Sequence, residues 1–219
     1  MILGDNMAEN GTRQFVKYNF FKVMAEWRRL PDRERVDSKR EFAAVVEEWR
    51  THMFIRSYSL VGLRGDADIL LWQACESLEQ LQEMMTSVWK TRLGGYLEHP
   101  YSYLAMTHLS QYVGQHRHEG QEGASTRLRP GSHGQYFIVY PFLKTRQWHV
   151  LPREERQRMM SDHIRIGHKY PTVKINTAYS FGLDDPEFVL GFEMDDPGDF
   201  LQLVEELRMI PTSQYTESE

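Results

Sequence analysis

The stretch "YPFLKTRQWHVLPREER", residues 140–156, repeats an earlier stretch, "YNFFKVMAEWRRLPDRER", residues 18–35. Both contain a tyrosine, a lysine, a tryptophan and a Leu-Pro pair in the same order, followed by a charged run. The similarity continues downstream, because Pro31 and Pro152 are 121 residues apart and Gly62 and Gly182 are 120 residues apart. A repeat this long predicts two duplicated domains rather than a solenoid, whose repeats span about 20–50 residues.

Each half predicts the same order of secondary structure. An apolar strand, "QFVKYNFFKV" or "QYFIVYPFLK", precedes a helix, then two strands joined by a polar turn, then a second helix. The β-α-β-β-α-β order is the ferredoxin-like pattern. We therefore expect an α+β fold of two tandem ferredoxin-like units, whose antiparallel sheets pack into a dimeric α+β barrel-like subunit. The expected parts are an N-terminal domain of residues 1–113, a linker of residues 114–133 and a C-terminal domain of residues 134–219.

Composition narrows the class of protein. The chain has 219 residues, 41% of them hydrophobic, and a net charge of −5, so no general affinity for nucleic acids is expected. A single cysteine, Cys75, excludes an intramolecular disulfide and suits a reducing compartment. No signal-peptide pattern opens the chain, and no apolar run is long enough to span a membrane. We expect a cytoplasmic protein.

The two halves differ in their first helices. Adding 121 to Phe42 and Val46, which lie on the apolar face of the first helix, gives His163 and Gly167. The second half thus carries an imidazole on the inward face and no side chain one turn beyond it. Two interpretations are open for His163: a core histidine satisfied by a hydrogen bond, or an axial ligand of haem iron beside a space. His168, five residues further on, is expected to be exposed.

Other cofactor and catalytic motifs are missing from the sequence. No zinc or calcium spacing occurs, and no glycine-rich nucleotide loop. Cys75 has no neighbouring catalytic motif, and a buried structural thiol is the better interpretation. The two interpretations of His163 therefore both stay open at this point.

The sequence resembles the chlorite dismutase-like family, and within it the peroxide-dependent coproheme decarboxylases. The resemblance covers nearly the whole chain, through "FFKVMAEWRRLP", "VGLRGDADILLW", "YPFLKTRQWHVLPREERQRMMSDH" and "FGLDDPEFVLGFE". It implies a homopentamer of doubled ferredoxin-like subunits, each with a haem site in the C-terminal half. His163, which closes the pattern "ERxxxMxxH", is implied to be the proximal iron ligand.

Family members divide by their distal residue. Chlorite dismutases carry an arginine thirteen residues after the proximal histidine, a position that falls on Asn176 here, with Ile175 as the alternative alignment. Neither residue is an arginine, whose guanidinium would hold chlorite near the iron. Chlorite dismutases also carry a glutamate just before Ser213, where this chain has Thr212. A ligand histidine without that carboxylate is expected to bind iron more weakly.

The decarboxylase branch implies roles for several further residues. Tyr140, in the segment "YPFLK", would form a radical near a propionate of the substrate, and Lys144 would pair with a carboxylate. Arg127, with Arg129 as its rival, and Ser213 would contact propionates, and Trp148 would lie beside the haem. Trp27 occupies the same repeat position as Trp148, so a structural role is open for both, and Tyr18 and Lys22 likewise repeat Tyr140 and Lys144.

The resemblance therefore implies a haem-binding oxidoreductase. The expected activity is peroxide-dependent oxidative decarboxylation of iron coproporphyrin to protohaem, with the porphyrin and hydrogen peroxide as reactants. The alternatives are a chlorite dismutase, a haem-binding or haem-sensing protein without turnover, and a family member without a cofactor.

Overall fold

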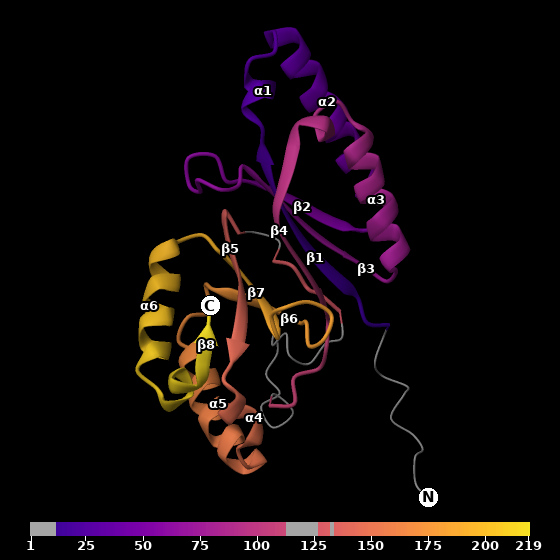
Figure 1. Ribbon diagram of the computed structural model, residues 1–219. Helices are drawn as coiled ribbons and strands as arrows, with labels where there is room; N and C mark the ends of the chain where they lie inside the picture. The colour runs from indigo at the N-terminus through magenta and orange to yellow at the C-terminus, as the bar shows by residue number, and fades with distance from the viewer. Residues whose placement is uncertain (1–11, 113–126, 132–133) are drawn as a thin grey trace, which may run out of the picture. The chain divides into compact units, whose positions relative to one another are not determined.

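The computed structural model describes residues 12–112, 127–131 and 134–219 (Figure 1). The chain divides into two compact units, Gln14–Leu104 and a second formed by Ala105–Glu219 with residues 1–13. We call them the N-terminal unit and the C-terminal unit. Of the expected linker, residues 114–133, only residues 127–131 are among those described.

The N-terminal unit has a β-α-β-β-α-β order with two short additional helices. Its elements are β1 (Phe15–Val23), α1 (Ala25–Arg28), α2 (Asp32–Trp49), β2 (Phe54–Ser59), β3 (Ile69–Cys75), α3 (Leu78–Lys90), the 3-10 helix η1 (Gly94–Tyr96) and β4 (Leu97–Met106). The strands are ordered β2-β3-β1-β4, and β3 pairs antiparallel with both β1 and β2. Helices α2 and α3 lie on one face of the sheet (Figure 1).

The C-terminal unit repeats this arrangement. Its elements are β5 (Tyr136–Lys144), α4 (Arg146–Val150), α5 (Arg153–Gly167), β6 (Lys174–Tyr179), β7 (Phe188–Met194), α6 (Pro197–Arg208), the 3-10 helix η4 (Pro211–Tyr215) and β8 (Thr216–Ser218). The strand order is β6-β7-β5-β8, which matches the first unit strand for strand. The expected tandem of ferredoxin-like units is confirmed.

The repeated sequence corresponds to one structural junction. In each unit the first strand ends, one short helix follows, and Pro31 or Pro152 immediately precedes the long helix. Both long helices carry acidic residues in their first turn, where the helix dipole favours negative charge. Gly62 and Gly182 have positive φ angles of 81° and 71° in the β2–β3 and β6–β7 turns. Glycine adopts this conformation without steric cost, which explains its repetition.

Strand register corrects one predicted correspondence. The amide of Val23 donates to Asp68 Oδ2 over 2.8 Å, and the amide of Lys144 donates to Glu187 Oε2 over 3.0 Å. Lys144 therefore corresponds to Val23, 121 residues earlier, and the prediction that it repeats Lys22 is wrong by one residue.

The same shift applies to the tyrosines of these strands. Asn19 lies opposite Leu71 as Tyr140 lies opposite Leu190, and both leucines pack in the helix-covered cores. Tyr18, next to Asn19, points to the other face and stacks on Trp72. Because successive strand residues point to opposite faces, the one-residue slip changes which face each tyrosine occupies.

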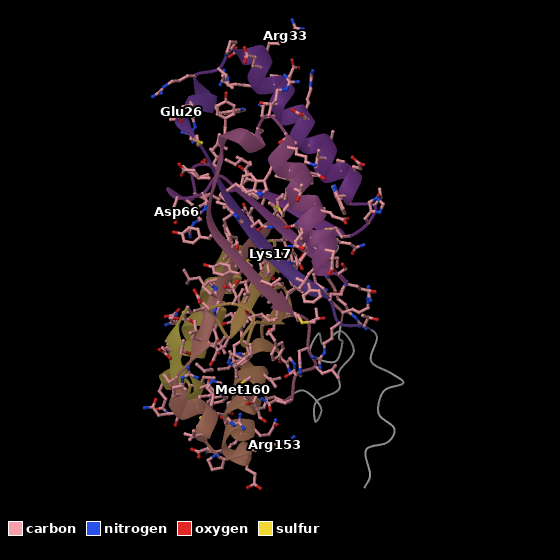
Figure 2. All side chains as sticks on the ribbon, turned by 45° about the vertical axis from the view of Figure 1, so that its right-hand side comes forward. Lys17, Glu26, Arg33, Asp66, Arg153 and Met160 are labelled. Atoms are coloured by element: carbon pink, nitrogen blue, oxygen red, sulfur yellow. The ribbon has the colours of Figure 1, made fainter. Side chains whose placement is uncertain are left out.

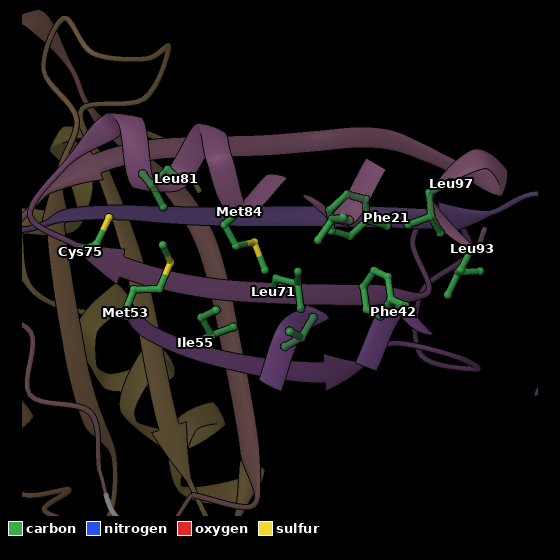
Figure 3. Packing of buried hydrophobic residues seen from close by; sticks show 12 residues of the cluster. Phe21, Phe42, Met53, Ile55, Leu71, Cys75, Leu81, Met84, Leu93 and Leu97 are labelled. Carbon is green, nitrogen blue, oxygen red and sulfur yellow. The ribbon is translucent and has the colours of Figure 1, made fainter. Parts of the chain in front are cut away.

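The helix-covered core of the N-terminal unit is the more fully packed one. Twelve described residues form its buried cluster, among them Phe42 and Val46 of α2, Leu71 of β3 and Met84 of α3 (Figure 3). The corresponding buried cluster of the C-terminal unit contains five described residues: Ile166, Val173, Phe192, Met194 and Leu203. Among the described residues, the cluster of fully buried apolar side chains between helices and sheet is therefore smaller in the second unit. None of the helices in the described part of the chain is both long and apolar enough to cross a membrane.

Candidate functional site

His163 lies on α5 of the C-terminal unit, and its ring is half-buried. Within the described part of the chain, no hydrogen bond to this ring is found. Burial, with a smaller contribution from the positive charge of Lys144, lowers the pKa of His163 to about 4. The imidazole is therefore neutral near pH 7 and keeps a nitrogen lone pair, the form that binds a metal ion.

Open space surrounds the position of Gly167, one turn from His163. A Cβ atom built at Gly167 would meet no atom within 4 Å. The equivalent residues of the first unit, Phe42 and Val46, are 8% and 6% exposed and fill the core there. Met159, which is buried, and Met160, labelled in Figure 2, lie on the same helix as His163. The pair of histidine and glycine thus replaces two bulky apolar groups at one helix face.

Tyr140 extends from β5 towards the same helix-covered face. Its ring stacks on Phe192, with centroids 5.5 Å apart, and packs against the cluster that contains Ile166 of α5. Burial raises the pKa of the Tyr140 hydroxyl to about 12, although the charge of Arg208 opposes the shift. The side chain is therefore a neutral phenol near pH 7 and retains its hydrogen.

Lys144 ends β5, and its ammonium is held without a carboxylate partner among the described residues. The Nζ atom donates to the carbonyl of Thr212 over 3.1 Å and lies 4.8 Å from the centroid of the Trp148 ring. Burial lowers the pKa of Lys144 to about 8, while the charge of Glu187 raises it. In the first unit, by contrast, Lys22 Nζ lies 3.2 Å from Asp68 Oδ1 in an ion pair. Of the two lysines, only Lys144 has no carboxylate within ion-pair distance among the described residues.

Trp148 is 4% exposed, and its ring lies next to Lys144 and two tyrosine rings. Its ring centroid is 6.4 Å from that of Tyr112 and 5.7 Å from that of Tyr215. The matching Trp27 of the first unit donates its indole N–H to Ser38 Oγ over 2.9 Å. A packing role is therefore visible for Trp148, together with a cation–π contact to Lys144.

Strand β6 separates the two candidates for the distal position. Ile175 lies opposite Phe192 and packs in the helix-covered cluster with Ile166. Asn176 points to the other face, is 2% exposed, and donates from Nδ2 to Glu193 Oε1 over 2.9 Å. Ile175 therefore shares the face of Tyr140, and Asn176 does not.

The remaining predicted residues are Arg127, Arg129 and Ser213. Arg127 and Arg129 are exposed in the short segment 127–131, whose last residue, Gly131, donates its amide to Glu193 Oε1 over 2.8 Å. Ser213 Oγ lies 2.8 Å from the carbonyls of both Arg208 and Ile210, so its single hydrogen is used within its own turn.

One charged residue beside the site escaped sequence reasoning. Glu187 accepts the Lys144 amide, and its Oε1 atom lies 2.8 Å from His149 Nε2. Its equivalence to Asp68, 119 residues earlier, is the signal that could have revealed it. Cys75 lies in the other unit, where burial raises the pKa of its thiol, and the thiol donates to the carbonyl of Ser77 over 3.0 Å.

Chemically, the C-terminal unit combines three features on one side of its sheet. It offers a neutral imidazole, a space beside it and a phenol, with an ammonium at the end of the same strand. No group of three or more His, Cys, Asp or Glu side chains that could hold a metal ion occurs among residues 12–112, 127–131 and 134–219.

Comparisons with known proteins show what the whole chain is similar to. The profile of the chlorite dismutase family matches residues 33–219. Over 207 residues the chain is 28% identical to the coproheme decarboxylase of Mycolicibacterium smegmatis, covering 93% of this chain and 87% of that protein.

Solved structures give the same result. A mutant chlorite dismutase from Candidatus Nitrospira defluvii superposes with a TM-score of 0.84 at 28% identity, over 94% of this chain and 86% of that one. A haem-binding protein from Thermus thermophilus gives a TM-score of 0.79 at 26% identity, over 93% and 86% of the two chains.

Proposed function

Because the chain belongs to the chlorite dismutase family, we propose that it is a haem-dependent oxidoreductase that oxidatively decarboxylates iron coproporphyrin to protohaem with hydrogen peroxide. The observation that carries the proposal is the divergence of the two units: His163 and Gly167 stand where Phe42 and Val46 fill the first core. The similarity to a coproheme decarboxylase supports the choice of substrate.

The residues of the C-terminal unit fit a porphyrin. His163 would bind the iron through a nitrogen of its neutral ring, since no hydrogen bond within the described residues engages it. The open space at Gly167 leaves room beside that ligand. When bound, the iron porphyrin reacts with peroxide and supplies oxidising equivalents.

Tyr140 would carry those equivalents to the substrate's side chains. A phenol that loses an electron and its proton becomes a radical, which can take a hydrogen atom from a propionate side chain and return to a phenol. Transfer of one further electron to the second oxidising equivalent of the same peroxide, with loss of carbon dioxide, would then leave a vinyl group. The raised pKa of Tyr140 supports this role, because the hydroxyl keeps the hydrogen that the cycle needs.

Lys144 would hold a carboxylate of the porphyrin. Its ammonium is half-buried beside Trp148, and among the described residues it has a carbonyl but no carboxylate within ion-pair distance. A propionate would supply the missing negative charge. Arg127 and Arg129 remain proposed propionate contacts, and Ile175 is the proposed distal residue. Ser213 would contact a propionate by turning its hydroxyl away from the carbonyls of Arg208 and Ile210.

An apolar distal residue also bears on chlorite chemistry. Ile175 offers no hydrogen-bond donor, and Asn176 is engaged with Glu193 on the opposite face of the strand. A chlorite anion would therefore find no cationic donor at this position. We expect little or no oxygen release from chlorite.

The test uses purified protein given iron coproporphyrin and then peroxide. Loss of two carbon dioxide molecules, measured by mass spectrometry, and the appearance of two vinyl groups would support the proposal. An unchanged porphyrin would contradict the decarboxylase assignment. An oxygen electrode with added chlorite would then test for chlorite dismutation. A Soret band with neither chemistry would indicate a haem carrier or sensor, and no Soret band a protein without the cofactor. We also propose a homopentamer, which light scattering on the purified protein checks.

A further inference from the structure

A cleft of about 570 Å³ lies in the N-terminal unit, at the end of β1. Helix α1, the start of α2 and the β2–β3 turn enclose it, and Glu26 and Asp66, labelled in Figure 2, mark α1 and the turn. The main lining residues are Lys22, Trp27, Arg28, Arg35, Val61 and Asp68. Its volume is within the range of small-molecule sites.

Positive charge exceeds negative charge at the centre of the cleft. Lys22 and Arg28 share one carboxylate, that of Asp68, at 3.2 and 3.3 Å. Burial alone would raise the pKa of Asp68, but hydrogen bonds from the Val23 amide and Lys22 lower it, so this carboxylate is ionised. Two cations against one buried anion leave one positive charge uncompensated.

The other charges around the cleft are balanced or exposed. Arg64 pairs with Asp66 through two contacts of 2.7 and 2.5 Å, and Arg35 pairs with Asp32 through one of its terminal nitrogens. The Nε atom of Arg35 is buried and has no hydrogen-bond partner in the described part of the chain. Arg35 also lines the cleft, and its side chain is 36% exposed, so it adds a third cationic side chain there.

One wall of the cleft is apolar. Trp27 lines the cleft, and its indole N–H donates a hydrogen bond to Ser38 Oγ. Val61, in the β2–β3 turn, is 69% exposed. In the C-terminal unit the equivalents of Arg28 and Val61 are His149 and Phe181, whose rings meet at a centroid distance of 5.9 Å. The Nε atom of Arg156, the equivalent of Arg35, also lacks an acceptor among the described residues, so this feature is common to both units.

We propose that this cleft binds a small oxyanion, a phosphate or carboxylate attached to a flat apolar body, with the oxyanion on Lys22, Arg28 and Arg35 and the apolar body against Trp27 and Val61. Each interaction uses a side chain that lines the cleft: the two cations that share Asp68, the Arg35 guanidinium, and the apolar Trp27 and Val61. The site is independent of the proposed haem chemistry, because every lining residue belongs to the N-terminal unit.

The test titrates the full chain with phenyl phosphate and with inorganic phosphate at constant ionic strength and follows ³¹P line broadening. We expect saturable binding of both and tighter binding of phenyl phosphate. Arg28→Gln should weaken both by about tenfold, the change expected on losing one charge-assisted hydrogen bond. Val61→Ser should weaken only phenyl phosphate.

Arg33→Gln is the matched control, because Arg33 is an α2 arginine with a 93% exposed side chain outside the cleft. It should leave both affinities unchanged. Absence of saturable binding would overturn the site, and so would an equal loss in Arg33→Gln and Arg28→Gln, which would indicate diffuse surface charge. Equal affinities for the two probes would overturn the apolar part of the ligand.

Discussion

At the scale of single residues, the two units differ in what their equivalent side chains can do. Asn19, the equivalent of Tyr140, has its amide nitrogen 2.5 Å from the Gln73 side-chain oxygen. Val23, the equivalent of Lys144, is apolar. The phenol and the ammonium therefore have no counterpart in the first unit, although a tyrosine and a lysine stand one residue away. Their chemistry belongs to the C-terminal unit alone.

Tyr140→Phe tests the proposed radical role. The ring and its stacking on Phe192 remain, but the transferable hydrogen is removed. Porphyrin affinity should stay within about threefold, while the rate of decarboxylation should fall by about 100-fold or more, equivalent to about 2.7 kcal/mol. Stopped-flow spectroscopy with peroxide and product analysis measure the two effects. A variant that decarboxylates at the original rate would remove Tyr140 from the mechanism.

Lys144 predicts a pH dependence of substrate affinity. Its pKa is about 8 in the free protein, and a bound carboxylate would raise it. The attraction is therefore fully present below pH 8 and is lost as pH rises above 8. Soret titrations with iron coproporphyrin between pH 6.5 and 9.5 should show this decline.

Two variants isolate the contribution of Lys144. Lys144→Arg keeps its charge throughout this range and should show no decline from this position. Lys144→Met should bind more weakly at pH 7 and also lack the decline. If Lys144→Met retained the pH dependence of the unmodified protein, another group would be responsible.

At the scale of elements, side chains alternate along β6, so neighbouring residues lie on opposite faces of the sheet. Ile175 faces the helices and the proposed porphyrin, and Asn176 faces the other side, where it bonds the buried Glu193. Glu193 also holds Gly131, so this carboxylate ties β6 and β7 to the segment that carries Arg127. The two positions are adjacent in sequence and should be separable by mutation.

Asn176→Ala should therefore lower stability without changing the iron environment. It leaves a buried carboxylate with one bond fewer, which costs about 1–3 kcal/mol of unfolding free energy. Ile175→Gln should instead shift the Soret band of the ferric porphyrin complex, with a smaller loss of stability. Urea unfolding and absorption spectra of both variants check this. The opposite pattern would make Asn176 the distal residue.

At the scale of the whole molecule, one architecture is used twice with different interiors. The first unit packs twelve buried residues between its sheet and helices, and the second packs five among those described. Phe42 and His163 occupy equivalent places in these interiors. The duplication thus provides a matched pair of positions. Phe42 is expected to stabilise the fold, and His163 is expected to bind iron.

Phe42→Ala and His163→Ala should have opposite consequences. Removing the buried phenyl ring should cost about 3–5 kcal/mol of unfolding free energy and leave the Soret band of the porphyrin complex unchanged. His163→Ala should abolish that band's axial-ligand signature at little cost in stability. Denaturant unfolding and porphyrin titration of both variants test the pair. If folded Phe42→Ala also lost the axial-ligand signature of the Soret band, the proposed separation of roles between Phe42 and His163 would be contradicted.

The sequence by itself determined the tandem β-α-β-β-α-β order and the substitution of His163 and Gly167 for Phe42 and Val46. These features follow from local periodicity and from a constant repeat spacing, which survive in a linear chain. Only the tertiary structure decided the register, and with it the faces of Tyr140 and Ile175. A strand's side chains alternate with a period of two, so an uncertainty of one residue in alignment exchanges the two faces completely.

The surroundings of Lys144 likewise depend on tertiary structure. Thr212 reaches it from η4, Trp148 from α4 and Glu187 from the turn before β7, and its lowered pKa is a property of that assembly. No spacing in the sequence encodes those contacts, because they form only when β7 pairs with β5 and η4 packs beside them.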